Sequence, residues 1–115
     1  MSYRTRGQSS GRIVASDAAL VITDNDGVGS GVILLAESTT GTKAATFSWN
    51  APSDSLGGAA FTLFLLVRSG GSYTVACTYL GTGGTVTIDA ALERPTFHRI
   101  GSTLHCTGLG GATFA

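Results

Sequence analysis

Apolar and polar residues alternate along most of this chain in short runs that predict β-strands. The alternation is cleanest at 44–50, where Ala45, Phe47 and Trp49 share one side and polar side chains occupy the other. A period of two is typical of a half-buried strand, and the best helix candidate is a single turn at 90–93. The strands predicted in this way are 12–16 and 19–23, which are either two strands or one bent strand, and 31–37, 44–50, 60–68, 72–80, 85–89, 96–100, 103–107 and 112–114.

Turn-forming residues separate these runs, and 17 of the 115 residues are glycine. Residues 24–27 read DNDG and predict a turn, while Gly101-Ser102 suits a two-residue type II′ loop. The runs 61–68 and 72–80 predict a hairpin. Short links between so many strands favour an all-β fold, an antiparallel β-sandwich or jelly roll of about 8–10 short strands.

Two of the predicted strands, 31–37 and 60–68, are apolar on both sides. In the second, Phe64 and Leu66 lie opposite the side that carries Phe61, Leu63, Leu65 and Val67. Such a strand in an antiparallel protein lies either beneath a second layer or at a subunit contact. The candidates for a subunit or partner interface are Phe64, Leu66, Tyr73 and Tyr79.

Charged residues are scarce. They make up 12% of the chain, about half the usual fraction, and a free soluble monomer normally needs more surface charge than this. Cover by partner subunits explains the composition better than a surface solvated by hydroxyls and glycines alone. The net charge of zero provides no overall field to attract nucleic acid or an anionic membrane, so neither is expected as a partner.

The N-terminal residues differ from the rest, which we expect to form one domain over 12–115. Residues 1–11 are polar and rich in glycine and serine, and Arg4, Arg6 and Arg12 all precede the first acidic residue. This composition predicts a flexible basic arm whose arginines contact a partner; the alternative is a frayed terminus with incidental arginines. The segment lacks the apolar run of a signal peptide, and no apolar stretch is long enough to span a bilayer.

Candidate catalytic and ligand sites find little support. The glycine-rich run 27–31 leads into a strand rather than the helix that a phosphate-binding loop requires. The acids at 24–26 lack the spacing of a calcium loop. Cys77 and Cys106 do not form a CxxC pair, and we expect two reduced cysteines that pack as small hydrophobes. No triad or paired carboxylates are recognisable, so we expect a protein that is not an enzyme and has no cofactor.

The two histidines form a possible pair. If Gly101-Ser102 is the hairpin loop, His98 lies directly opposite His105, with Cβ atoms about 5 Å apart. Such a pair can share a metal, but a zinc site needs a third ligand from elsewhere. The preferred interpretation is an incidental pair on a hydroxyl-rich face, with no metal. The same register places Phe97 opposite Cys106 on the other, more core-like face.

The last third of the chain resembles structural proteins of tailed bacteriophages. Residues 83–91 read GGTVTIDAA and residues 95–105 read PTFHRIGSTLH, with Leu104 where those proteins usually have tryptophan. The chain looks like a small capsid decoration (cement) protein. That resemblance implies a β-sandwich or jelly roll that forms dimers or trimers, is assembled in the host cytoplasm, and lies on the capsid surface of the virion. There it would bind the major capsid protein and stabilise the head against internal DNA pressure.

Two alternatives to this function remain open. Tail-fibre and spike domains share the same pattern. A carbohydrate-binding module belongs to a different class, in which Trp49, Tyr73 and Tyr79 would form an exposed platform for sugar rings.

Overall fold

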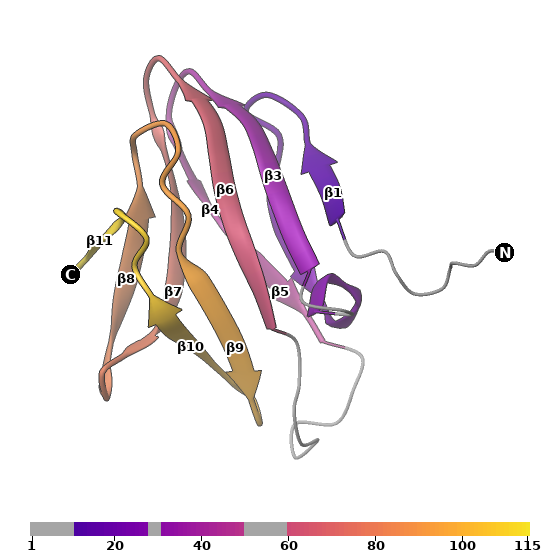
Figure 1. The fold of residues 1–115 in the computed structure, drawn as a ribbon, viewed down its shortest axis with the longest axis vertical. Coiled ribbons are helices and arrows are strands. Elements are labelled where there is room, and N and C mark those ends of the chain that lie inside the picture. The colour runs from indigo at the N-terminus through magenta and orange to yellow at the C-terminus, as the bar shows by residue number, and fades with distance from the viewer. Residues whose placement is uncertain (1–10, 28–30, 50–59) are drawn as a thin grey trace, which may run out of the picture.

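The computed structural model describes residues 11–27, 31–49 and 60–115. They form eleven strands and one short 3₁₀ helix, which confirms the all-β prediction (Figure 1). The elements are β1 (Gly11–Val14), β2 (Val21–Thr23), η1 (Asp24–Gly27), β3 (Gly31–Ser38), β4 (Thr42–Ala44), β5 (Thr46–Ser48), β6 (Ala60–Arg68), β7 (Ser72–Tyr79), β8 (Thr82–Ile88), β9 (Thr96–Ile100), β10 (Thr103–Gly108) and β11 (Thr113–Phe114).

The strands build two layers around one core. The main sheet has the order β1-β3-β6-β9-β10-β7-β8-β11, with β4 paired to β7, and β2 and β5 form a small second sheet. Buried residues of β3 and β6 share a single hydrophobic core with buried residues of β7 and β8. Because these pairs of strands are separated in the sheet order, the main sheet must fold over on itself, and β4 and β5 pass behind β3 and β6 in Figure 1.

The sheet is mixed, so the antiparallel part of the prediction was too narrow. The pairs β1–β3, β3–β6, β4–β7, β2–β5 and β10–β7 are parallel, whereas β6–β9, β9–β10, β7–β8 and β8–β11 are antiparallel. A jelly roll, which is built from antiparallel strands, is not confirmed by this order.

The predicted hairpin between 61–68 and 72–80 is wrong, because β6 pairs with β3 and β9 while β7 pairs with β4, β8 and β10. The link between them crosses from one layer to the other and packs on the β3–β4 link. Gly70 and Gly71 make that contact possible, because a Cβ on either one would lie within 2.5 Å of a backbone oxygen of that link. The amides of Ser69 and Gly70 both donate to the carbonyl of Ser38.

The core is formed by the inward side of each alternating strand. Leu63 and Leu65 of β6 are fully buried, whereas Val67, which the alternation places on the same side, lies beyond the edge of the core and is 51% exposed. The β9–β10 hairpin has the predicted register, and the positive φ of Gly101 (63°) fits the two-residue loop. The other large buried side chains are Leu20, Ile22, Ile33, Leu35, Phe61, Tyr73, Val75, Val86, Ile88, Phe97, Arg99 and Leu104.

A buried arginine joins η1 to the main sheet. The side chain of Arg99 is 2% exposed and pairs with the Asp24 carboxylate at 2.8 Å. Its Nε donates to the carbonyl of Gly101 at 2.7 Å, and its guanidinium lies 4.7 Å from the centre of the Trp49 ring. A charge can be buried in this way because it has an ionic partner and hydrogen bonds.

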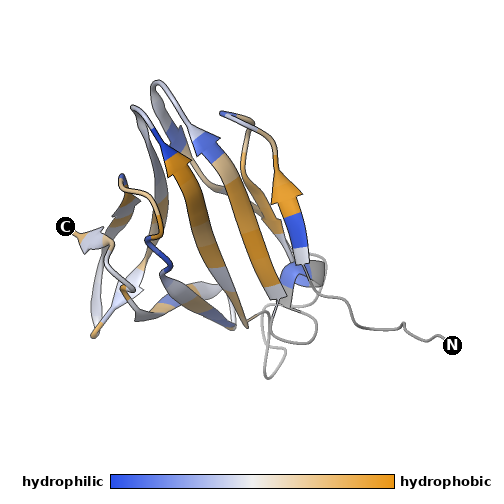
Figure 2. Cartoon of the chain, turned by 45° about the horizontal axis from the view of Figure 1, so that its top comes forward, coloured by the Kyte–Doolittle hydropathy of each residue, from blue (hydrophilic) through white to orange (hydrophobic). Residues whose placement is uncertain are grey.

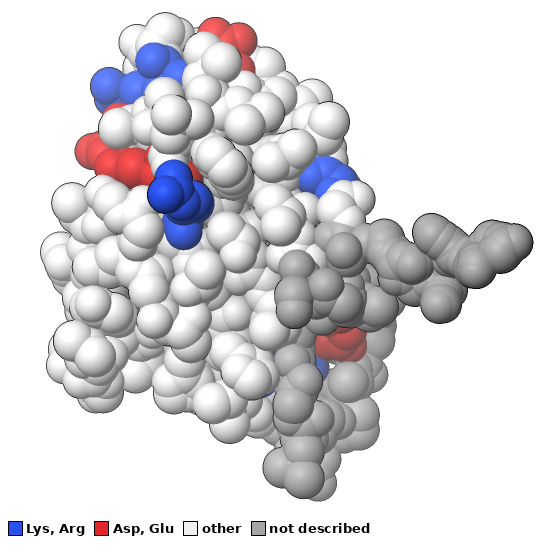
Figure 3. Space-filling view, in the orientation of Figure 1, with Lys and Arg blue, Asp and Glu red and all other residues white. Residues whose placement is uncertain are grey.

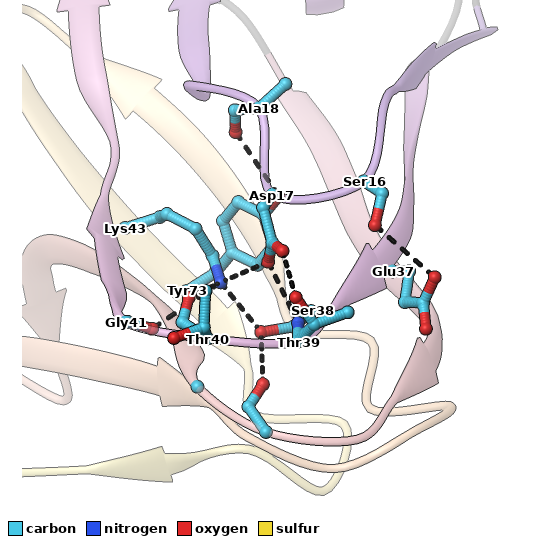
Figure 4. A network of polar contacts seen from close by, with 12 residues as sticks. Ser16, Asp17, Ala18, Glu37, Ser38, Thr39, Thr40, Gly41, Lys43 and Tyr73 are labelled. Atoms are coloured by element: carbon cyan, nitrogen blue, oxygen red, sulfur yellow. Dashed lines mark hydrogen bonds and ion pairs between the residues drawn. The ribbon is translucent and has the colours of Figure 1, made fainter.

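A polar network closes the opposite end of the core (Figure 4). The Lys43 ammonium donates to Asp17 Oδ1, Ser38 Oγ and the Thr40 carbonyl, each at 2.9 Å. It also lies 4.8 Å from the centre of the buried Tyr73 ring. These contacts connect the β1–β2 link, the β3–β4 link and β7, so we assign the network a structural role.

Asp17 is the acceptor at the centre of this network. Hydrogen bonds from the backbone amide and hydroxyl of Thr39 and from Lys43 hold the pKa of Asp17 well below its usual value. A lowered native-state pKa means that this carboxylate stabilises the fold above about pH 4, its ordinary pKa, and that the stabilisation is lost as the pH falls below that value.

We therefore expect Asp17→Asn to lower the melting temperature at pH 7, with a difference from wild type that shrinks as the pH falls below 4. Asparagine tolerates the positive φ of residue 17 (56°), so the substitution removes charge without straining the backbone. Thermal unfolding followed by circular dichroism across this pH range is the measurement. Asp89→Asn at an exposed position is the control and is expected to have no effect. A pH-independent difference for Asp17→Asn would contradict the assignment.

Candidate functional site

The side of β1, β3 and β6 that faces away from the core is apolar. Its large apolar residues are Ile13, Val32, Leu34, Phe64 and Leu66, which we call the outer face; Thr62 lies on the same side, beside Val32. The parallel registers place Ile13 beside Leu34 and Leu34 beside Phe64, so three strands contribute to one continuous row. Ile13 is 68% and Leu66 37% exposed, and the other three are half-buried by their neighbours in the sheet.

The strand directions make this surface unusual. Sheets built only of parallel strands occur almost only where both faces are covered, and their strands are apolar on both sides for that reason. The strands β1, β3 and β6 form a parallel region of this kind within the mixed sheet. Here β1, β3 and β6 run parallel and one face packs on the core. None of the described residues forms a layer over the other face (Figure 1). The outer face thus has the apolar composition of a buried sheet surface, but no described part of the chain packs on it.

Charge is sparse on the same side of the molecule. Figure 2 shows β3 and β6 as mostly hydrophobic along their length. In the space-filling view, which has the orientation of Figure 1, the visible surface over these strands is largely uncharged, with charged side chains mainly near its margins (Figure 3). The guanidinium of Arg94 lies 6.0 Å from the centre of the Phe64 ring and borders the outer face. An apolar surface rimmed by polar groups is typical of a protein–protein contact.

The four predicted interface residues do not lie together. Phe64 and Leu66 are on the outer face, but Tyr73 is fully buried in the core and donates its hydroxyl to the Ala18 carbonyl at 3.3 Å. Tyr73 therefore offers no surface to a partner or to a sugar ring, and its inclusion was wrong. Tyr79 is half-buried on β7, where its ring packs 5.3 Å from that of Phe114.

Sequence reasoning did not single out Ile13 and recognised Val32 and Leu34 only as part of a two-sided strand. Their grouping depends on the parallel pairing of β1 with β3 and of β3 with β6, which joins segments far apart in the chain. The two-sided apolar pattern was the signal available, but it does not specify which strands are neighbours.

The predicted arm arginines have different positions. Arg12 belongs to β1, where its Nε contacts Asp26 Oδ1 at 2.6 Å and its Nη2 donates to the Val21 carbonyl at 2.6 Å. It therefore forms part of the folded domain, and its assignment to the arm is corrected. Arg4 and Arg6 lie outside the described residues.

The cysteines are free, as predicted. Cys106 lies opposite Tyr79 in the β7–β10 pairing, two residues beyond Cys77, so the two cysteines are not directly opposed. Burial raises the pKa of Cys77 to about 11 and also raises the pKa of Cys106. Both groups are therefore thiols at neutral pH and are poor nucleophiles.

In the described part of the chain, no three or more His, Cys, Asp or Glu residues come together as a group able to hold a metal ion. Within the same residues, no helix has the length and apolar character needed to cross a membrane.

Neither a protein-family model, nor a curated protein, nor a solved structure matches this chain. Residues 83–91 and 95–105, on which the sequence-based expectation of a phage structural protein depends, contribute to β8 and to the β9–β10 hairpin. These two parts are not adjacent in the sheet, because β7 lies between β8 and β10.

Proposed function

We propose that this protein is a structural assembly protein that binds another protein through the outer face of β1, β3 and β6. The observation that carries the proposal is a set of parallel strands, apolar on both sides, whose second side no described layer covers. A partner that covers this side would supply the environment in which parallel sheets are normally found.

For the partner we propose the major capsid protein of a tailed bacteriophage, with this chain as a decoration protein on the capsid surface. The resemblance of residues 83–105 to structural proteins of tailed bacteriophages supports this choice of partner. The uncharged, apolar outer face supports the mode of binding. Full burial of one Leu or Phe side chain contributes about 1.5–3 kcal/mol, so a few such contacts give modest affinity per copy. Many copies bound to the assembled lattice would stabilise it by mass action.

The test is co-sedimentation of the protein with purified capsids, using a variant that makes the outer face polar. The double variant Ile13→Thr/Leu34→Thr places β-forming residues at both positions but removes apolar contact. We expect its affinity for capsids to fall at least about tenfold, which corresponds to a loss of roughly 1.4 kcal/mol or more in binding free energy. The matched control is Val21→Thr, which replaces an apolar residue that is 42% exposed on the separate small sheet. It is expected to leave binding unchanged.

The outcome also separates the partners. Unchanged capsid affinity in the double variant would overturn the proposed surface, while binding to isolated tails but not to capsids would favour a tail-fibre or spike role. Sedimentation velocity of the free protein shows whether the same substitutions dissociate a dimer or trimer, in which case a second copy covers the outer face. A decoration protein should in addition raise the temperature at which the capsids are disrupted.

A further inference from the structure

His98 and His105 lie directly opposite each other on the antiparallel strands β9 and β10. Ile100 and Thr103 flank the two-residue loop and form the first pair, so His98 and His105 form the third. In an antiparallel hairpin such pairs alternate in type, and the third has the same hydrogen-bonded geometry as the first, with Cα atoms about 5.5 Å apart. Their Cβ atoms are then about 5 Å apart.

Both imidazoles project from the side of the hairpin that faces away from the core. Their chain neighbours Phe97, Arg99, Leu104 and Cys106 are buried, so by the alternation of a strand the histidines point the other way. Each histidine is half-buried. On the neighbouring strands, Ala60 of β6 lies beside His98 and Thr78 of β7 lies beside His105. Because both of these side chains are short, they leave the two imidazole rings room to turn toward each other.

We propose that His98 and His105 form a chelating site for a divalent transition-metal ion such as Cu²⁺, Ni²⁺ or Zn²⁺. Imidazole is a suitable ligand for all three ions. Metal–nitrogen bonds of about 2.0–2.1 Å bring two ligating nitrogens to roughly 3 Å from each other, a separation that two imidazoles can reach from Cβ atoms about 5 Å apart. The hairpin already holds the backbone in place, so binding orders only two side chains, and water completes the coordination.

The surroundings determine the strength of the site. The other outward positions of the hairpin are Thr96, Ile100, Thr103 and Thr107, and in the described part of the chain the adjoining positions Ala60 and Thr78 are uncharged as well. No carboxylate or thiolate there adds a third strong ligand, and no ammonium or guanidinium repels the ion. Binding is therefore of modest affinity and follows the order Cu²⁺ above Ni²⁺ and Zn²⁺.

Isothermal titration of the full chain with CuCl₂, NiCl₂ and ZnCl₂ at pH 7.5 tests this site. We expect one ion per chain and a melting temperature that rises with metal concentration. His98→Thr and His105→Thr each remove one ligand while keeping a β-forming residue, and each is expected to weaken binding at least tenfold.

Thr103→Ser, on the same face of β10, is the control and should bind metal as wild type does. Circular dichroism and the melting temperature without metal establish that each variant is folded, and His98→Gln and His105→Gln replace any threonine variant that is not. Equal affinity in wild type and in folded histidine variants would overturn the site, since the metal would then be held elsewhere. A loss in only one of the two histidine variants would also overturn the shared chelate.

Discussion

Replacing Leu65 with alanine is expected to lower the free energy of unfolding by about 3–5 kcal/mol, as for other fully buried leucines. Leu65 has no exposed surface and lies beside Leu35 in the centre of the parallel β3–β6 pair. Truncation removes apolar contacts, and the backbone of β6 cannot collapse into the space, because at Leu65 it is hydrogen-bonded to β3 on one side and to Leu92 and Glu93 on the other. Guanidinium denaturation measures the change, seen as a lower midpoint with an unchanged slope.

The neighbouring residue provides a matched control. Leu66 has the same side chain on the same strand but points to the outer face, where it is 37% exposed, so Leu66→Ala should cost less than about 1 kcal/mol. For capsid binding the proposed function predicts the opposite ranking of the two variants. Leu66→Ala should weaken capsid binding, whereas a folded Leu65→Ala protein should still bind capsids. Equal losses of stability in the two variants would show that the core and the outer face are assigned incorrectly.

Replacing Arg99 with methionine is expected to lower the free energy of unfolding by about 3 kcal/mol, the lower end of the range for breaking a buried ion pair. The lower end applies because the partner Asp24 is 21% exposed and keeps part of its hydration. The variant would leave this carboxylate without its guanidinium and the Gly101 carbonyl without its donor. Trp49 fluorescence provides a second readout, because the guanidinium lies against the indole ring.

Arg68→Met is the control for this prediction. Arg68 is exposed at the end of β6 and donates to the Gly71 carbonyl at 3.2 Å, and its replacement should change stability by no more than about 0.5 kcal/mol. A loss for Arg99→Met that is as small as for Arg68→Met would contradict a structural role for the buried pair. Arg99→Lys keeps the charge but not the planar donor geometry, so an intermediate loss is expected.

Features that depend on neighbouring residues were predictable from the sequence. The β9–β10 register, including the opposition of His98 and His105, follows from one two-residue loop, because the turn determines the pairing of the residues on either side. The alternation predicted at 44–50 matches the structure over the described residues 44–49, with Phe47 and Trp49 half-buried and their ring centres 5.5 Å apart. The strand there is interrupted at Ala45, where its pairing changes from β7 to β2.

Features that depend on distant residues were not predictable in this way. The hairpin expected between β6 and β7 is absent, because two apolar strands with a short link can either pair or occupy different layers, and the sequence of the link does not distinguish the two. Likewise Arg99 reads as an ordinary polar residue in a strand. The Asp24 carboxylate that pairs with it lies 75 residues away in the chain and reaches it only in the folded protein.

The sequence by itself determined the all-β class, the positions of most strands and the two-sided apolar character of β3 and β6, since alternation and turn chemistry act over a few residues. Only the tertiary structure decided that β1, β3 and β6 run parallel, that Tyr73 is buried while Ile13 is exposed, and that five apolar residues share one outer face. The physical reason is that strand order and direction depend on how apolar surfaces from distant segments pack together.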